Sequence, residues 1–214
     1  MMKRRDFSRA CGAALAGAAV LPAFAQQRFE ASKDYLPLEK PAPVDAPSGK
    51  IEVVEFFWYN CPHCNAFEPA LEAWIKRLPK DVVIRRVPVA FSSAFQGQQR
   101  LYYTLEAMGL VDKIHAKVFA AIHVERKRLE QPEVIADWIA SQGVDKTKFM
   151  EQFNSFSVAS KVTRAGQLTA AYKVEGVPAM GVAGRFYTDG TLTRNMERSL
   201  QVVDYLVGEV RKGR

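Results

Sequence analysis

The pattern of apolar and polar positions predicts a strand–helix–strand unit in the first half of the chain. Residues 51–58 are rich in β-branched and aromatic side chains, which is typical of a strand buried on both faces of an α/β sheet. Residues 65–78 place apolar side chains at helical spacing, although Pro69 should kink this helix. Residues 82–89 form a second strand-like run. We expect the two strands to be parallel and joined by a right-handed crossover, the usual hand for such a unit.

A series of helical patterns follows this unit. The patterns cover residues 98–108, 111–128, 132–141, 146–153 and 157–172. Gly109, Pro132 and Gly143 separate them, as expected of residues that begin or end helices. The sequence therefore predicts an all-helical insert within an α/β domain.

Shorter elements are predicted after the helical patterns and before the strand–helix–strand unit. Residues 179–183 and 185–188 predict a β-hairpin, and residues 200–211 predict a closing amphipathic helix. The proline-rich segment 26–49 holds one short predicted strand, around residues 35–38.

The first 25 residues predict a cleavable export signal. A basic start precedes a mild apolar stretch, residues 10–21, and Ala23-Phe24-Ala25 matches the small-x-small pattern of a signal peptidase site. The stretch is too short to span a bilayer, so we expect no permanent anchor. Arg4-Arg5 resembles a twin-arginine signal, but Ser8-Arg9 departs from that pattern, and both export routes stay open.

Removal of this segment changes the charge and the cysteine count. The segment holds four basic residues and one acidic residue, so the formal charge falls from +7 to +4, too little to predict nucleic-acid binding. The basic run 126–128 is more typical of a solvated helix face. Cys11 leaves with the signal, and only Cys61 and Cys64 remain. A bridge that closes so small a loop constrains the unfolded chain little, so this pair indicates chemistry rather than a structural disulfide.

Cys61-Pro62-His63-Cys64 lies where the first strand ends and its helix begins. Free N–H groups and the positive end of the helix dipole favour the thiolate of Cys61. Pro62 suits a first helical turn, and His63 adds a donor or a positive charge. Cys64, about one turn further on, should be more buried. Thiolate stabilisation favours the reduced pair, which makes the disulfide a stronger oxidant of other proteins.

Other uses of a Cys-x-x-Cys pair find less support in the sequence. A zinc site lacks two further ligands of suitable spacing. His115 and His123 are eight residues apart, too far to chelate together, and are interpreted as surface or packing residues. Covalent haem attachment needs a histidine after the second cysteine, where this chain has Asn65. An inert structural bridge is the remaining alternative.

Two other residues are candidates for the site. Glu55 lies within an apolar strand, where it is either a perturbed acid that relays protons to a thiol or an outward-facing or strand-end carboxylate. Pro178 follows Gly176-Val177. Because only about one X–Pro bond in twenty is cis in folded proteins, the sequence alone does not predict a cis bond there.

Three motifs together resemble the DsbA family of periplasmic thiol:disulfide oxidoreductases. They are Glu55-Phe56-Phe57, Cys61-Pro62-His63-Cys64 and Gly176-Val177-Pro178-Ala179-Met180. The resemblance implies an α/β, thioredoxin-like fold with an inserted all-helical domain. It divides the chain into a signal (1–25), a thioredoxin-like domain (26–92 and 162–214) and a helical insert (93–161).

The resemblance also implies roles for these residues and for partners. Pro178 would be a cis-proline facing the Cys61–Cys64 disulfide, Val177 would offer backbone hydrogen bonds to an extended substrate, and Glu55 would be a buried acid beneath the site. The substrates would be newly exported proteins, and a quinone-linked membrane protein of the DsbB type would reoxidise the pair. No cofactor besides the redox-active disulfide is implied.

Two positions depart from the family pattern, and two rival functions stay open. Asn60 is more polar and Gly181 is smaller than usual, and we interpret both as positions that border the substrate groove. The rival oxidoreductase is a reductase or isomerase, although Pro62-His63 favours oxidation. The rival from another class is a metallochaperone that binds a soft metal through Cys61 and Cys64. Its usual methionine-rich clusters are missing, because the methionines of the mature chain are scattered.

Overall fold

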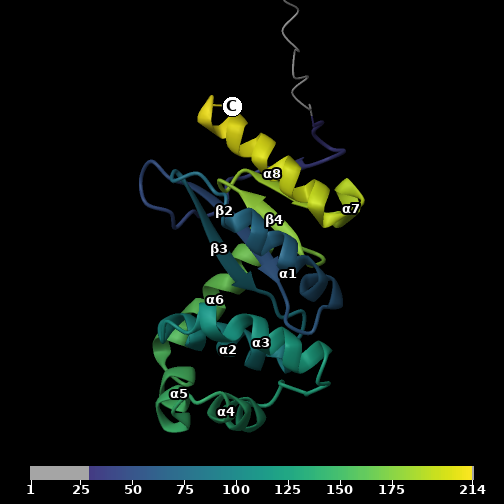
Figure 1. The fold of residues 1–214 in the computed structure, drawn as a ribbon. Helices are drawn as coiled ribbons and strands as arrows, with labels where there is room; N and C mark the ends of the chain where they lie inside the picture. Colours follow the sequence, from purple (N-terminus) through teal and green to yellow (C-terminus); the bar gives the residue numbers. More distant parts are fainter. Residues whose placement is uncertain (1–28, 214) are drawn as a thin grey trace, which may run out of the picture.

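The computed structural model describes residues 29–213, so the predicted signal and Cys11 lie outside the described residues. A five-stranded sheet forms the centre of one half of the molecule (Figure 1). Its strands lie in the order β1 (Leu36–Pro37), β5 (Phe186–Asp189), β4 (Ala179–Val182), β2 (Ile51–Phe57) and β3 (Val82–Pro88). β2 and β3 are parallel, as predicted, and the other neighbours are antiparallel.

The helix between the parallel strands is α1 (Pro62–Ile75), which begins with proline in its first turn and continues through Pro69. It ends before the predicted residue 78. The N–H groups of Arg77 and Leu78 donate to carbonyls only three residues back, and Pro79 disfavours helical backbone at the residue before it.

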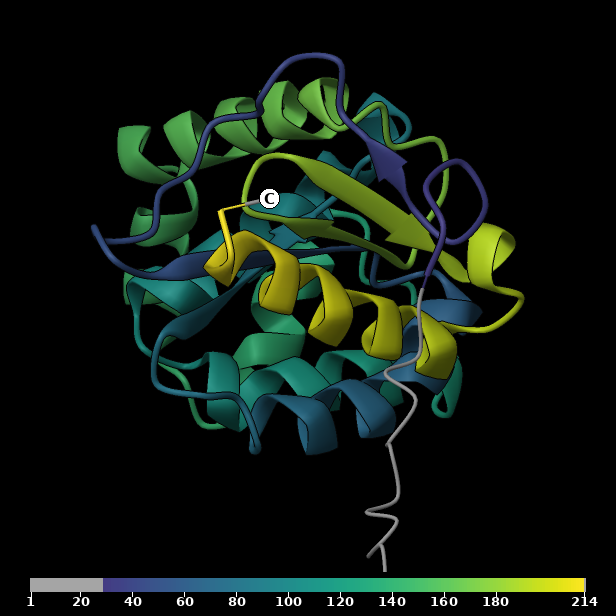
Figure 2. The same ribbon diagram turned by 90° about the horizontal axis from the view of Figure 1, so that it is seen from above.

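The side chains of β2 alternate between two cores. Val53 packs with α1 and with α8 (Met196–Arg211) on one face. Val54 and Phe56 pack on the other face, with Tyr172 and with the helices that lie between β3 and β4 in the chain. Figure 2 shows α6 (Phe156–Ala171) and α8 on opposite sides of the sheet. Both faces of the central strand are therefore covered, as the apolar run predicted.

The helical segment holds η1 (Ser93–Phe95), α2 (Gln96–Ala107), α3 (Val111–His123), α4 (Pro132–Ser141), α5 (Lys146–Phe153) and α6. The bounds of α4 and α5 are those predicted, and Asp145 caps α5 by accepting from the Lys148 N–H. The predicted boundary between residues 161 and 162 falls inside α6, so one continuous helix leads from this segment back to the sheet. The division into two domains stays a prediction.

α3 ends five residues before the predicted bound. The N–H groups of Glu125 and Lys127 donate to the Ala120 and Ala121 carbonyls, and Arg126 adopts a left-handed backbone with φ of 60°. The basic run 126–128 therefore lies in a loop, and its interpretation as a helix face was wrong.

The β4–β5 hairpin was predicted, and three residues connect its strands: Ala183 and Gly184, both with positive φ, and Arg185. The sequence did not predict α7 (Gly190–Thr193), which Asp189 caps. α8 begins at Met196, earlier than predicted, because Asn195 caps it by accepting from the Arg198 N–H.

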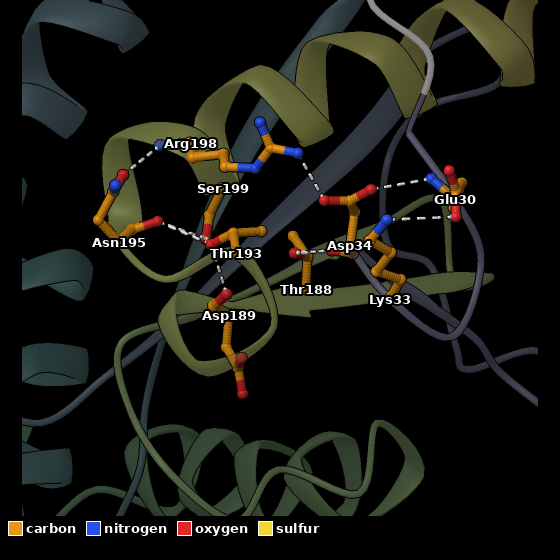
Figure 3. A network of polar contacts seen from close by, with 9 residues as sticks. All are labelled: Glu30, Lys33, Asp34, Thr188, Asp189, Thr193, Asn195, Arg198 and Ser199. Atoms are coloured by element: carbon orange, nitrogen blue, oxygen red, sulfur yellow. Dashed lines mark hydrogen bonds and ion pairs between the residues drawn. The ribbon is translucent and has the colours of Figure 1, made fainter.

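A polar network joins the first described residues to the start of α8 (Figure 3). Asp34 accepts from Arg198 Nη2 at 2.7 Å and from the Glu30 N–H at 2.9 Å, and its carbonyl accepts from Thr188 Oγ1 at 2.7 Å. The Thr193 hydroxyl lies 2.7 Å from the Ser199 hydroxyl. The network therefore holds the loop between α7 and α8 against the sheet.

Candidate active site

A tight turn delivers Cys61 to the start of α1. The Cys61 N–H donates to the Trp58 carbonyl at 2.9 Å, so Tyr59 and Asn60 form the turn between them. Cys61 is the N-cap of α1, with extended backbone. Its sulfur therefore lies beside the N–H groups that no helical carbonyl uses.

The two cysteines are free thiols in the structure, and their pKa values are shifted in opposite directions. The pKa of Cys61 falls to about 6, chiefly because the Cys64 thiol donates to its sulfur; burial opposes this, and the N–H groups of Cys64 and His63 and the charge of His63 assist. Burial and the neighbouring Cys61 sulfur raise the pKa of Cys64, which is fully buried. At neutral pH Cys61 is the thiolate and Cys64 the thiol; the helix N–H groups invoked from the sequence contribute, but the Cys64 thiol is the larger cause.

Val177 and Pro178 lie beside Cys61. Their peptide bond is cis, and the Val177 carbonyl oxygen is 3.3 Å from Cys61 Sγ. A cavity of about 520 Å³ begins there; His63, Val177 and Pro178 line one side, and the loop between α7 and α8 lines the other. The structure thus brings His63 and the Val177–Pro178 segment together next to the reactive sulfur.

Glu55 is fully buried in the middle of β2, so of the two alternatives left open, that of an outward-facing or strand-end carboxylate was wrong. Burial raises its pKa to about 8; Arg86, whose Nε lies 3.1 Å from Glu55 Oε2, opposes the rise, and Glu68 and Glu72 add to it. The charge of Glu55 in turn contributes to the raised pKa of Cys64. An acid that titrates near neutral pH therefore lies within electrostatic reach of the buried thiol.

Sequence reasoning missed the groups around Glu55. Arg86 donates to Glu68 at 3.3 Å and to Glu72 at 2.7 Å. His115 is 3% exposed and contacts Glu68 at 3.4 Å, so it is a packed residue with polar partners, and the surface alternative was wrong. The available signal was an arginine inside an apolar strand, which needs a buried acid as its partner.

The two departures from the family pattern have separate structural causes. Asn60 accepts from Gln98 at 2.7 Å and donates to Glu130 at 3.4 Å, so it binds the helical segment. Gly181 is buried, and a Cβ there would lie 2.3 Å from Tyr172 Cε1. Gly181 makes room for Tyr172 and does not line the cavity, so its interpretation as a groove position was wrong.

Two other features are absent from residues 29–213. No three His, Cys, Asp or Glu side chains in this range are grouped so that they could hold a metal ion. No helix in the same range has the length and apolar character needed to cross a membrane.

The fold and the cysteine pair define the class of protein: a thioredoxin-like oxidoreductase with a helical insert. The family described as DSBA-like thioredoxin domain matches residues 82–201. The thiol:disulfide interchange protein DsbA of Bordetella pertussis is 46% identical over 212 residues, covering 99% of this chain and 100% of that protein. The chain belongs to the DsbA family of thiol:disulfide oxidoreductases.

Solved structures agree with this assignment. The crystal structure of Pseudomonas aeruginosa DsbA is 43% identical, with a TM-score of 0.82 over 86% of this chain and 96% of that chain. The DsbA of Xylella fastidiosa is 33% identical, with a TM-score of 0.77 over 84% of this chain and 96% of that chain. The thioredoxin-like fold with a helical insert, expected from the resemblance, is confirmed.

Proposed function

We propose that this protein oxidises pairs of thiols in newly exported proteins, in the periplasm, by donating its Cys61–Cys64 disulfide. The observation that carries the proposal is the difference in pKa between the two thiols: that of Cys61 is lowered to about 6, and that of Cys64 is raised. Stabilising the reduced form in this way makes the oxidised form a stronger oxidant, so it donates its disulfide readily.

The first step forms a mixed disulfide. A substrate thiolate attacks Cys61 Sγ, the Cys61–Cys64 bond breaks, and its electron pair goes to Cys64 Sγ, which takes up a proton. Cys61 is the sulfur attacked because Cys64 is fully buried. Glu55 supplies that proton; its raised pKa, which keeps much of it protonated near neutral pH, and the effect of its charge on Cys64 support this role.

The second step releases the product. The other substrate thiolate attacks the substrate sulfur of the mixed disulfide, and Cys61 leaves as a thiolate. A thiol of low pKa is the better leaving group, so the acidity of Cys61 favours this direction. The substrate loses two electrons and the enzyme pair gains them.

Binding and reoxidation involve two partners. The backbone of Val177 hydrogen-bonds an extended substrate chain that enters the adjacent cavity; the contact of its carbonyl with Cys61 and its place in the cavity lining support this role. We propose that a quinone-linked membrane protein of the DsbB type then removes the two electrons.

The test combines a thiolate titration with trapping. We expect the absorbance of the reduced protein to give a Cys61 pKa near 6, and His63→Ala to raise it. Cys64→Ser should accumulate a mixed disulfide when its Cys61 thiolate attacks a client thiol activated as a glutathione disulfide, with glutathione as the leaving group, and Cys61→Ser should not. A Cys61 pKa near about 8.5, together with a potential as reducing as about −270 mV, would overturn the oxidase in favour of a reductase.

A further inference from the structure

Two histidines of α3 hold Tyr59, which lies two residues before Cys61. Tyr59 is 1% exposed. Its hydroxyl lies 2.8 Å from His115 Nδ1, and its carbonyl oxygen lies 2.8 Å from His123 Nε2. Both histidines belong to the helical segment, whereas Tyr59 belongs to the turn that precedes α1.

The hydrogen-bond roles are set by the groups involved. A carbonyl only accepts, so His123 donates to Tyr59. Burial lowers the pKa of His115, and a neutral imidazole has one donor and one acceptor. Tyr59 then donates to His115 Nδ1, and Nε2–H donates to Glu68 Oε1 at 3.4 Å. His115 thereby connects the turn to Glu68, which Arg86 also contacts.

The flanking residues of the turn contact the helical segment too. The ring of Trp58 lies edge-on to that of Phe95, with the ring centres 4.5 Å apart. Asn60 is bonded to Gln98 and Glu130. All three residues that precede Cys61 are therefore held by this segment, and the sequence interpretation of the two histidines did not include that role.

We propose that His115 and His123 are positioning residues for the redox reaction: by holding Tyr59 they set where the Cys61 sulfur lies relative to the start of α1. The thiolate is stabilised chiefly by the Cys64 thiol and also by the N–H groups of Cys64 and His63. Hydrogen bonds of this kind weaken steeply once distance or angle departs from the optimum. A turn free to shift would therefore hold a less acidic Cys61.

Paired substitutions test the proposal, which rests on the proposed function. His115→Leu and His123→Leu remove the contacts to Tyr59. His115→Gln keeps an acceptor for the Tyr59 hydroxyl, and His123→Gln keeps a donor for the Tyr59 carbonyl. We expect each Leu variant to raise the Cys61 pKa by about one unit, and to lower about tenfold the equilibrium constant for reduction of the disulfide by glutathione. The Gln variants should stay within about threefold of the parent protein.

A control separates positioning from stability. Phe149→Leu weakens the core of α5, away from the turn. It should lower the free energy of unfolding yet leave the Cys61 pKa and the glutathione equilibrium unchanged. Leu variants that match Phe149→Leu in both readouts would overturn the positioning role.

Two further outcomes are informative. If the Leu variants do not fold, Tyr59→Phe removes only the hydroxyl, and an unchanged Cys61 pKa in that variant contradicts the role of His115; an unchanged pKa in His123→Ala does the same for His123. A parent protein with an ordinary Cys61 pKa would instead contradict the proposed function, so the two failures are distinguishable.

Discussion

The acidity of Cys61 should appear as a pH-dependent stability of the reduced protein. The perturbation is Cys61→Ala, which removes the titrating group, and both proteins are studied with Cys64 reduced. The folded pKa of about 6 lies below the ordinary value. A depressed pKa contributes stability that is fully present above the unfolded pKa of about 8.5 and is lost as the pH falls through the folded value.

The magnitude follows from these two pKa values. Between pH 5 and pH 7 the contribution rises by about 1.3 kcal/mol, and above the unfolded pKa it approaches about 3.4 kcal/mol. Cys64 adds nothing in the lower window, because its raised pKa keeps it protonated, as it also is in the unfolded chain. The packing lost on substitution does not depend on pH and cancels from the slope.

The assay is urea unfolding of the reduced parent protein and of Cys61→Ala, at pH 5, 6 and 7 in the presence of a reductant. The difference in the free energy of unfolding should grow with pH by the amount given above. A difference that stays flat within about 0.3 kcal/mol, or that shrinks as the pH rises, would refute the reasoning.

Three further predictions concern residues around the site. Because the pKa of Glu55 is raised to about 8, the stability that Glu55 contributes is lost as the pH rises from its ordinary pKa through 8. In denaturant titrations over that window, the free energy of unfolding of the parent oxidised protein should therefore fall relative to that of Glu55→Gln. A difference between the two proteins that stays constant with pH would contradict the assignment. Gly181→Val should cost about 2–3 kcal/mol, because its side chain overlaps Tyr172, and Tyr172→Leu should recover part of that loss; a single variant as stable as the parent protein would exclude the overlap. A double-mutant cycle of Asp34→Asn and Arg198→Met should give a coupling energy of about 1 kcal/mol, and a zero coupling would mean that this ion pair does not hold the start of α8.

The sequence by itself determined the elements whose signals are local. Strand β2 and helices α4 and α5 lie where a run of β-branched and aromatic residues, a first-turn proline and helical spacing predicted them. The position of Cys61 at a helix start follows from the same kind of signal. These signals act between residues a few positions apart, so the chain carries them without reference to the rest of the fold.

Only the tertiary structure decided which polar groups surround the cysteines. Glu55 and Arg86 meet because two parallel strands are in register, and Tyr59 meets His115 across a separation of 56 residues. Gly181 is small because Tyr172 of another element occupies the space beside it. A buried polar group needs a partner, but which distant residue supplies that partner depends on how the elements pack, and no local pattern of side chains specifies it.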